Sequence, residues 1–330
     1  MIRPLKNIFH YLFILPRTLK RIRIIDSILD ELISDVNKVP EWRLITKKSG
    51  FILRMTQYVE VHSLLDFSLC GLANSEISSK ELRACVYFCA CLPLYDDFFD
   101  KNNLSAKEIK ALMLAPESFD SKNAVEGMFI HLLKEVYANL PNQQLFAFYF
   151  EKLFYAQEES KRLMDSSLSL EEVKYIAFEK GGYSALLFRS ILSHEFIKGE
   201  KEALYQLGAV GQLMDDIFDL YDDVEEGLNT MATKYKNDFT PVVELYNMEV
   251  LSLKNLFLKL DYDISNKNNF IREIMLIVNG GTLCGKQFLE AQKANNNKFS
   301  IQEIGREALI CDMEKKSNWL KMVRLSISNA

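Results

Sequence analysis

The sequence predicts an all-α protein, and three observations support this fold class. First, its 330 residues include only 13 glycines and 7 prolines, where usual abundances of roughly 7% and 5% would give about 23 and 16. Second, 48% of the residues are hydrophobic, which is enough for a sizeable core and excludes disorder as the main state. Third, apolar residues recur at helical steps of three and four along most of the chain. The scarcity of turn residues also disfavours β-sandwiches and barrels.

Helical periodicity accounts for the chain segment by segment. Residues 22–37 are amphipathic, whereas 49–72 and 80–101 are apolar enough for buried helices. The polar stretch 101–123 predicts a loop with one short helix, Pro141 divides the next segment into two helices, and Ser167 marks a helix start. These patterns predict helices over 22–37, 49–72, 80–101, 123–163 in two parts, 169–198, 200–226, 241–260, 268–293 and 300–327.

The first 40 residues differ in composition from the rest of the chain. Residues 1–23 hold six Lys or Arg and no acidic residue, around a short apolar run from Ile8 to Leu15. This run is too short for a membrane span, which needs about 20 residues, and it makes a poor signal peptide. Two interpretations stay open: a helix docked on the core, or peripheral contact with an anionic membrane surface. We expect a basic helical extension over 1–40 and one all-α domain over 41–330, since no repeat or linker divides that part.

Charge and cysteine content exclude several classes of function. The net charge of −5 gives no footprint for nucleic-acid binding. The six cysteines form no CxxC pair and have no histidine nearby in the sequence, which argues against a zinc site or a disulfide framework. We therefore expect buried, reduced thiols in a cytoplasmic protein.

A first acidic cluster lies inside the apolar segment that ends near residue 100. Asp96 and Asp100 are four residues apart, so a helix places both carboxylates on one face, with Asp97 beside them. A solvated helix face is the ordinary explanation of an acidic run. Charges flanked by apolar residues, however, need pairing or a metal ion.

A second acidic cluster lies in the segment 211–223. Asp215, Asp219 and Asp223 follow one another at four-residue steps, and Asp216 stands next to the first of them. Oxygen ligands on helices, without histidine or thiolate, suit Mg²⁺, with Mn²⁺ as an alternative ion. Two such clusters in apolar surroundings predict a metal site.

These two motifs, DDxxD at 96–100 and QxxDDxxD at 212–219, resemble those of the class I isoprenoid (terpenoid) synthase superfamily. The resemblance covers about residues 50–300. It implies a single-domain helical barrel in which both motifs face each other across the mouth and bind Mg²⁺ ions that grip and ionise a prenyl diphosphate. It assigns catalysis to Asp96, Asp100, Asp215 and Asp219, with Asp97, Asp216 and Asp223 as further metal ligands. It also implies a homodimer.

Two subfamilies share features with the chain. Gln212 and the aspartates after it resemble the second motif of trans-prenyl diphosphate synthases, and Lys180 resembles a lysine that those enzymes place on the diphosphate; Gly208 and the residues after it run at the spacing of squalene/phytoene synthases. However, Gly181 replaces the expected threonine, and the arginine pair after the first motif is absent. A signature for a second diphosphate is missing as well. These departures favour cyclisation over chain elongation.

A departing diphosphate needs cations beyond the metal ions. The candidate diphosphate-binding residues are Lys180, Arg189, Lys234 and Gln212, although such residues more often pair on a surface. Aromatic rings beside the aspartates could stabilise a carbocation in an apolar cavity. The glycine pair 181–182 predicts either a helix break that exposes carbonyl groups or a tight helix crossing. The candidate cavity residues are Phe88, Tyr95, Phe99, Gly181, Gly182, Tyr183 and Phe218.

The sequence therefore favours a Mg²⁺-dependent terpene synthase that ionises a linear prenyl diphosphate, cyclises the carbocation and releases pyrophosphate. Two alternatives stay open. One is a prenyltransferase that couples two prenyl units, head-to-head or head-to-tail. The other is a catalytically silent homologue that serves as a partner subunit. The intact aspartates argue against silence, because a scaffold gains nothing from carboxylates that repel one another.

Overall fold

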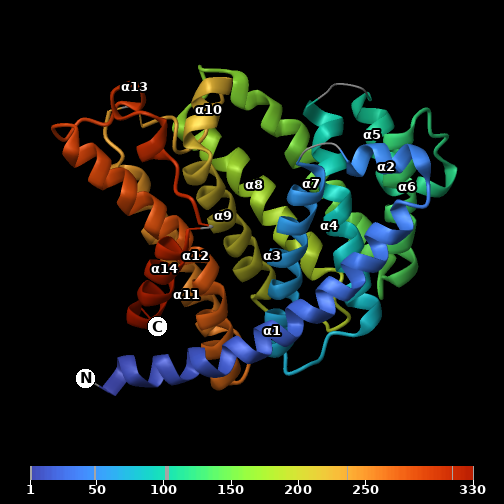
Figure 1. Ribbon diagram of the computed structural model, residues 1–330, viewed down its shortest axis with the longest axis horizontal. Helices are drawn as coiled ribbons and strands as arrows, with labels where there is room; N and C mark the ends of the chain where they lie inside the picture. The colour runs from blue at the N-terminus through green and yellow to red at the C-terminus, as the bar shows by residue number, and fades with distance from the viewer. Residues whose placement is uncertain (1, 48–49, 101–103, 236, 314, 330) are drawn as a thin grey trace. The chain divides into compact units, whose positions relative to one another are not determined.

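The computed structural model describes residues 2–47, 50–100, 104–235, 237–313 and 315–329, and it describes side chains for these except 2–18, 100 and 327–329. The regular structure of the described residues is helical throughout, with fourteen α-helices, three short 3₁₀ helices and no strand (Figure 1). The prediction of an all-α fold is confirmed.

Contacts along the chain group it into two compact units. The N-terminal unit comprises Phe9–Glu158 and Leu187–Glu195, and the C-terminal unit comprises Met1–Ile8, Glu159–Leu186 and Phe196–Ala330. Helices α1 (Ile2–Val36) and α8 (Leu170–Arg189) contribute to both. The N-terminal unit also holds α2 (Pro40–Thr46), α3 (Phe51–Leu72), α4 (Ser79–Asp100), α5 (Ala106–Leu114), η1 (Pro116–Ser118), α6 (Ala124–Asn139) and most of α7 (Gln143–Ser160).

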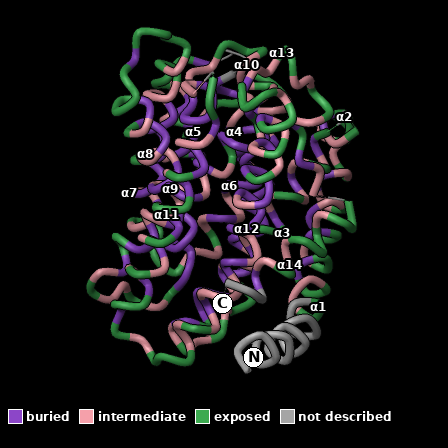
Figure 2. Tube along the Cα trace, turned by 90° about the vertical axis from the view of Figure 1, so that its left-hand side faces the viewer, coloured by how far each residue is buried: buried purple, intermediate pink, exposed green. Residues whose placement is uncertain are grey.

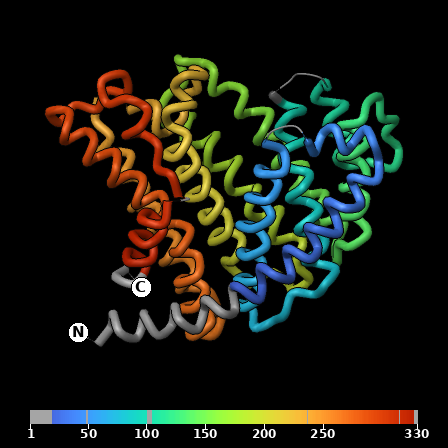
Figure 3. Tube along the Cα trace, in the orientation of Figure 1, coloured from blue at the N-terminus to red at the C-terminus, as the bar shows by residue number. Residues whose placement is uncertain are grey.

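The C-terminal unit holds the remaining elements, which Figure 3 follows from yellow-green to red. They are η2 (Lys161–Met164), α9 (Glu200–Phe218), α10 (Leu220–Glu226), α11 (Thr240–Lys259), α12 (Ile264–Ala294), α13 (Ile301–Ile304), η3 (Arg306–Leu309) and α14 (Lys316–Asn329). Each unit is described by itself below.

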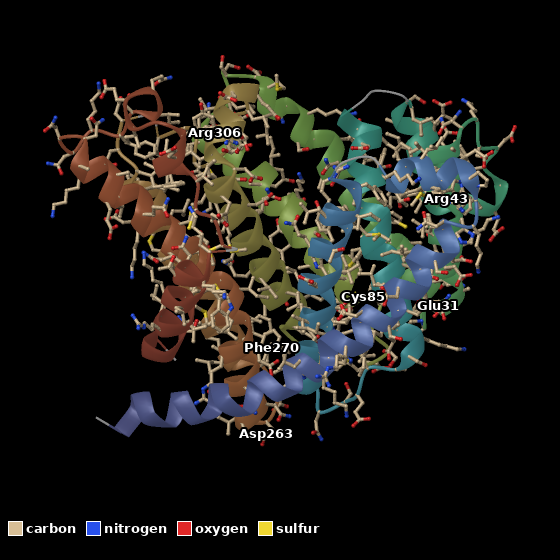
Figure 4. The ribbon with its side chains drawn as sticks, in the orientation of Figure 1. Glu31, Arg43, Cys85, Asp263, Phe270 and Arg306 are labelled. Carbon is tan, nitrogen blue, oxygen red and sulfur yellow. The ribbon has the colours of Figure 1, made fainter. Side chains whose placement is uncertain are left out.

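The core of the N-terminal unit is built around α4, which packs against α3 and α6. Every residue from Ala84 to Tyr95 is buried, in keeping with the apolar segment that predicts this helix. The Phe88 ring contacts the rings of Phe146 and Phe150 at 5.2 and 5.4 Å between centroids. Cys85, labelled in Figure 4, lies 3.6 Å from the Ser63 hydroxyl of α3. The prediction of a buried helix is therefore confirmed for α4, whereas α3 is buried on one face and exposed at positions such as Leu53 and Val61.

The core of the C-terminal unit forms where α9, α11 and α12 pack together. The Tyr246 hydroxyl of α11 donates a hydrogen bond of 2.6 Å to the Val278 carbonyl of α12. A β-carbon at Gly281 of α12 would lie 2.6 Å from the Tyr246 side chain, so glycine permits this close approach. The buried positions alternate with exposed ones along these helices, as helical periodicity requires (Figure 2).

Helix α1 confirms the amphipathic segment predicted over 22–37. Ile25, Leu29, Leu32 and Val36 follow one another at helical steps and are buried. Residues between them, such as Asp26, are exposed. The side chains of 2–18, which include the apolar run and half of the basic residues of the segment with a possible membrane contact, lie outside the described residues.

Two predicted helices differ in their ends. The helix predicted over 169–198 ends at Arg189, and the Arg189 guanidinium donates hydrogen bonds to the His194 and Glu195 carbonyls of the segment that follows. The helix predicted over 300–327 is three elements, α13, η3 and α14. Gly305, with a φ of 81°, breaks it in the left-handed region that favours glycine. Both ends depend on features that apolar periodicity does not register.

The helix predicted over 200–226 is interrupted once. Helix α9 ends at Phe218, Asp219 has φ −91° and ψ 5°, and α10 begins at Leu220. Hydrogen bonds still link the Asp219 amide to the Asp215 carbonyl at 2.9 Å and the Asp223 amide to the Asp219 carbonyl at 2.8 Å. Aspartate is a weak helix former, and the bend occurs in the middle of the acidic segment.

No described helix is both long enough and apolar enough to cross a membrane.

Candidate metal and diphosphate site

The second acidic cluster lies where α9 passes into α10. Asp215 and Asp219 are solvent-exposed, Asp223 is half-buried, and Asp216 is buried with 5% of its surface exposed. The predicted stripe at four-residue steps survives the bend at Asp219, because the backbone hydrogen bonds on either side of it are helical. The structure therefore brings together the four carboxylates that the sequence analysis selects in this segment.

Mutual repulsion and burial raise the pKa values of this cluster. Burial raises the pKa of Asp219 to about 7 and that of Asp223 to about 7, and in both cases neighbouring carboxylates add to the effect. Burial raises the pKa of Asp216 to about 6, assisted by the charge of Asp215. Burial also raises the pKa of Asp215. Asp219 is exposed to solvent, and the repulsion by its neighbouring aspartates acts there in addition to burial. Four carboxylates that oppose one another's ionisation form an attractive environment for a cation.

Hydrogen bonds fix the buried end of the cluster. The Gln212 amide donates to Asp215 at 3.3 Å and to Asp216 at 3.2 Å. The second oxygen of Asp216 accepts from the Met231 backbone amide at 3.1 Å. A hydrogen bond from the Thr230 side chain lowers the pKa of Asp223 and opposes its larger rise through burial. The loop after α10 thus folds back and holds two of the four carboxylates.

Lys180 of α8 supplies positive charge to this cluster. Its ammonium group lowers the pKa values of Asp215, Asp216 and Asp219, against the larger effect of burial. No hydrogen bond or ion pair joins the Lys180 side chain to another described residue. Lys180 is therefore positioned near the carboxylates without being neutralised by a direct partner.

A close crossing of α8 and α9 places Lys180 beside the cluster. A β-carbon on Gly181 would lie 2.2 Å from the Gly208 carbonyl oxygen and 2.9 Å from the Gln212 β-carbon. A β-carbon on Gly182 would lie 2.4 Å from the Tyr205 ring. Helix α8 continues through both glycines. Of the two interpretations that the sequence leaves open for this glycine pair, the structure shows the tight crossing and no helix break.

The other two cationic candidates have different surroundings. The Lys234 ammonium donates to the Leu168 carbonyl at 2.8 Å and to the Ser166 carbonyl at 3.3 Å, so it holds a loop in place. Arg189 is fully buried in the N-terminal unit and donates to backbone carbonyls. Its charge also lowers the pKa of Asp66, which burial raises to about 7. Neither Lys234 nor Arg189 acts on the pKa values of the second acidic cluster as Lys180 does.

The first acidic cluster lies at the end of α4 in the N-terminal unit. The Asp96 carboxylate accepts a hydrogen bond of 3.2 Å from the Tyr58 hydroxyl, and the Asp97 carboxylate forms an ion pair of 3.3 Å with Arg54. Both aspartates are half-buried. The Asp100 side chain, which the sequence analysis includes in this cluster, lies outside the described residues. Two of the three predicted members are therefore shown side by side, each held from α3.

The aromatic candidates for a cavity lie in both units. Phe88, Tyr95 and Phe99 are buried in the N-terminal unit, where the rings of Tyr95 and Phe99 pack at 5.0 Å. Burial raises the pKa of Tyr95, and its buried hydroxyl makes no hydrogen bond to a described residue. In the C-terminal unit, Tyr183 packs edge-on against Tyr205, and Phe218 lies 3.6 Å from the position of a β-carbon on Gly280. These contacts are core packing, and they leave a cavity role as a prediction.

Sequence reasoning missed a polar row on α3, of which Arg54 and Tyr58 contact the first cluster. Arg54, Tyr58, His62 and Asp66 follow one another at four-residue steps in a largely apolar helix. Such a polar row on one helix face is the signal that could have identified them. Thr230 and Met231 were missed as partners of the second cluster, because their contacts arise from the fold of a loop.

Magnesium fits the donor chemistry of these residues. Both clusters offer carboxylate oxygens, the ligands that Mg²⁺ prefers, and they contain no histidine or thiolate that would favour zinc or iron. Among the described residues, no group of three or more His, Cys, Asp or Glu side chains already converges in the way that a metal centre requires.

Compared with known proteins, the chain matches no family model and no curated protein. Its resemblance to the isoprenoid synthases therefore rests on the two aspartate motifs and the residues around them.

Proposed function

We propose that this protein is a Mg²⁺-dependent class I terpene synthase, which ionises a linear prenyl diphosphate and cyclises the resulting carbocation. The observation that carries the proposal is the second acidic cluster. The pKa values of its four carboxyl groups are raised. Lys180, which makes no direct ion pair with a described residue, opposes this rise for Asp215, Asp216 and Asp219. This combination suits a cation–anion pair such as magnesium diphosphate better than a purely structural role.

In this proposal the acidic side chains bind the metal ions and the basic side chain binds the diphosphate. Asp215, Asp219 and Asp223 would hold Mg²⁺ in the C-terminal unit, and Asp96 would do so in the N-terminal unit. When bound, Mg²⁺ supplies Lewis-acid neutralisation of the charge on a departing diphosphate. Lys180 would bind a diphosphate oxygen directly and stabilise the same charge as the carbon–oxygen bond breaks.

Hydrogen bonds and buried aromatic rings around the two clusters support these roles. Gln212 and the Met231 amide fix the orientation of Asp216, so this carboxylate is preorganised before any ligand binds. The buried rings of Tyr95 and Phe99 near Asp96 would supply an apolar environment that keeps water from a carbocation. With no second prenyl unit bound, a double bond of the same chain would attack the cation to form a ring bond, and loss of a proton would give the neutral cyclic product.

The experiment is a pyrophosphate-release assay on the full chain with prenyl diphosphates of different lengths, each with and without isopentenyl diphosphate. We expect release with Mg²⁺ or Mn²⁺, none with EDTA, and cyclic products by mass spectrometry. Linear products that appear only with isopentenyl diphosphate would show prenyl coupling instead. Full turnover in EDTA would overturn the metal assignment. The absence of turnover with every substrate would favour a silent partner subunit.

A further inference from the structure

Helix α3 presents a continuous row of polar and aromatic side chains within the N-terminal unit. Arg54, Tyr58, His62 and Asp66 lie one turn apart, which places them on one face of the helix. The first two reach the acidic end of α4, through the contacts with Asp97 and Asp96. The row therefore ends at the carboxylates that the proposed function assigns to metal binding.

Stacked rings hold the Tyr58 side chain in place. The His62 ring lies parallel to the Phe188 ring at 3.7 Å between centroids, with 5° between the planes. The Tyr58 ring also stacks on His62, at 6.2 Å between centroids and with 22° between the planes. A tyrosine with its ring fixed in this way has few orientations left for its hydroxyl group. Because Asp96 accepts from that hydroxyl, its rotamer is limited in turn.

His62 contributes orientation without competing charge. Burial lowers its pKa to about 4, so the imidazole is neutral at physiological pH. The titratable and charged groups along the row include Asp96 and Asp97 from α4 and Arg54 and Asp66 from α3 itself; the charges of Arg189 and Glu81 act on Asp66. Arg54 offsets part of the repulsion between the two neighbouring aspartates.

We propose that Tyr58 is a positioning residue for the first metal-binding carboxylate: its hydroxyl fixes the orientation of Asp96, and the stack of His62 on Phe188 fixes Tyr58. The inference rests on the proposed function, since it concerns how one carboxylate of that site is prepared for a cation. Residues that hydrogen-bond to a metal ligand typically change metal affinity by 10- to 100-fold when they are replaced.

The test measures Mn²⁺ binding to the full chain without substrate, by the loss of the free-ion EPR signal. Tyr58→Phe removes only the hydroxyl and keeps the ring, and we expect about tenfold weaker binding of one ion. The matched control is Tyr137→Phe in the same unit, whose lost hydroxyl donates to the Met113 carbonyl at 3.1 Å. The control should leave Mn²⁺ affinity within about twofold of wild type, although it loses a comparable hydrogen bond.

A double-mutant cycle separates positioning from a general structural effect. Asp96→Asn should weaken the same ion, and adding Tyr58→Phe should then change the affinity no further, because the two changes act through one carboxylate. Unchanged affinity in Tyr58→Phe, or losses that simply add in the double variant, would overturn this inference and leave the proposed function intact. If wild type binds no Mn²⁺, or if Asp96→Asn binds it as well as wild type, the assignment of this metal site fails and the inference fails with it.

Discussion

Gly181 of α8 and Gly208 of α9 meet backbone to backbone. A β-carbon on Gly208 would lie 1.9 Å from the Gly181 carbonyl oxygen, and one on Gly181 would lie 2.2 Å from the Gly208 carbonyl oxygen. Neither backbone can move aside as a flexible side chain would. The residues next to this contact are Lys180 on one helix and, four positions on, Gln212 on the other. The crossing therefore sets the spacing between the cation and the carboxylates of the second cluster.

Replacing Gly208 with alanine should destabilise the protein by about 3 kcal/mol or more, because overpacking against backbone costs at least the usual 1–3 kcal/mol. The matched control is Gly211→Ala in the same helix, where a β-carbon would meet nothing within 4 Å. This control should stabilise the protein by up to about 1 kcal/mol, because alanine favours a helix interior over glycine. Urea unfolding of both variants checks the pair. Equal effects would show that the helices do not cross at Gly208.

Much of the fold could be predicted from the sequence, because apolar periodicity and scarce turn residues are local signals. The acidic stripe at Asp215, Asp219 and Asp223 was predictable for the same reason. The end of α8 at Arg189 was not, since apolar periodicity does not register the hydrogen bonds from the Arg189 side chain to the carbonyls of residues 194 and 195. Tertiary contacts likewise decide which lysine approaches the carboxylates. The crossing at Gly181 places Lys180 beside the cluster, whereas Lys234 donates to the Ser166 and Leu168 carbonyls.

In the metal-free protein, Asp219→Asn should become increasingly stabilising as the pH rises from 4 to 8. The pKa of Asp219 is raised to about 7, whereas an unfolded aspartate titrates near about 3.9. The carboxyl group therefore contributes stability that is fully present below about pH 4 and is lost as the pH rises through 7. After allowance for solvent screening, the free energy of unfolding of the variant relative to wild type should grow by about 1–2 kcal/mol. Urea unfolding in EDTA measures this difference, and a constant value across the range would contradict the raised pKa.

Asp66 and His62 should affect acid stability in opposite directions. Burial raises the pKa of Asp66 to about 7, so its contribution to stability is lost as the pH rises from about 4 to 7. Burial lowers the pKa of His62 to about 4, so its contribution is present above about 6.5 and is lost as the pH falls through 4. In wild type the two effects partly cancel between pH 4 and 6.5.

Asp66→Asn should remove this compensation. The free energy of unfolding of wild type relative to the variant should increase by up to about 4 kcal/mol as the pH falls from 7 to 4, at about 1.4 kcal/mol for each pKa unit. Urea midpoints at half-unit pH steps measure the difference between the two proteins. A difference that shrinks on acidification would show that Asp66 is ionised in the folded protein.

The two lysines should separate catalysis from stability. Lys180→Met should lower the rate of pyrophosphate release by about a hundredfold, as expected when one group that stabilises a developing anion is removed. Lys234→Met should keep the rate within about threefold but lose about 1–2 kcal/mol of stability, because its two hydrogen bonds to carbonyl groups disappear. Rate and thermal melting are measured for both. A large rate loss in Lys234→Met alone would move the diphosphate role to that residue.

The sharpest contrast lies within the second cluster, between Asp219 and Asp222. Burial raises the pKa of Asp219, and three neighbouring carboxylates add to the rise. Asp222 instead is exposed and forms an ion pair of 3.7 Å with Arg306 of η3, labelled in Figure 4. An exposed pair of this kind contributes at most about 1 kcal/mol.

Asp219→Asn keeps size and hydrogen bonding but removes the charge that a Mg²⁺ ion needs, so we expect a rate loss of at least about a hundredfold, or about 3 kcal/mol of transition-state stabilisation. The fold should survive, because loss of one carboxylate relieves repulsion in the metal-free protein. Asp222→Asn should change the rate by less than about threefold and stability by less than about 1 kcal/mol. If Asp222→Asn is the inactive variant, the side-chain directions around the bend at Asp219 are wrong. If both variants keep full activity, the second cluster does not bind the catalytic metal.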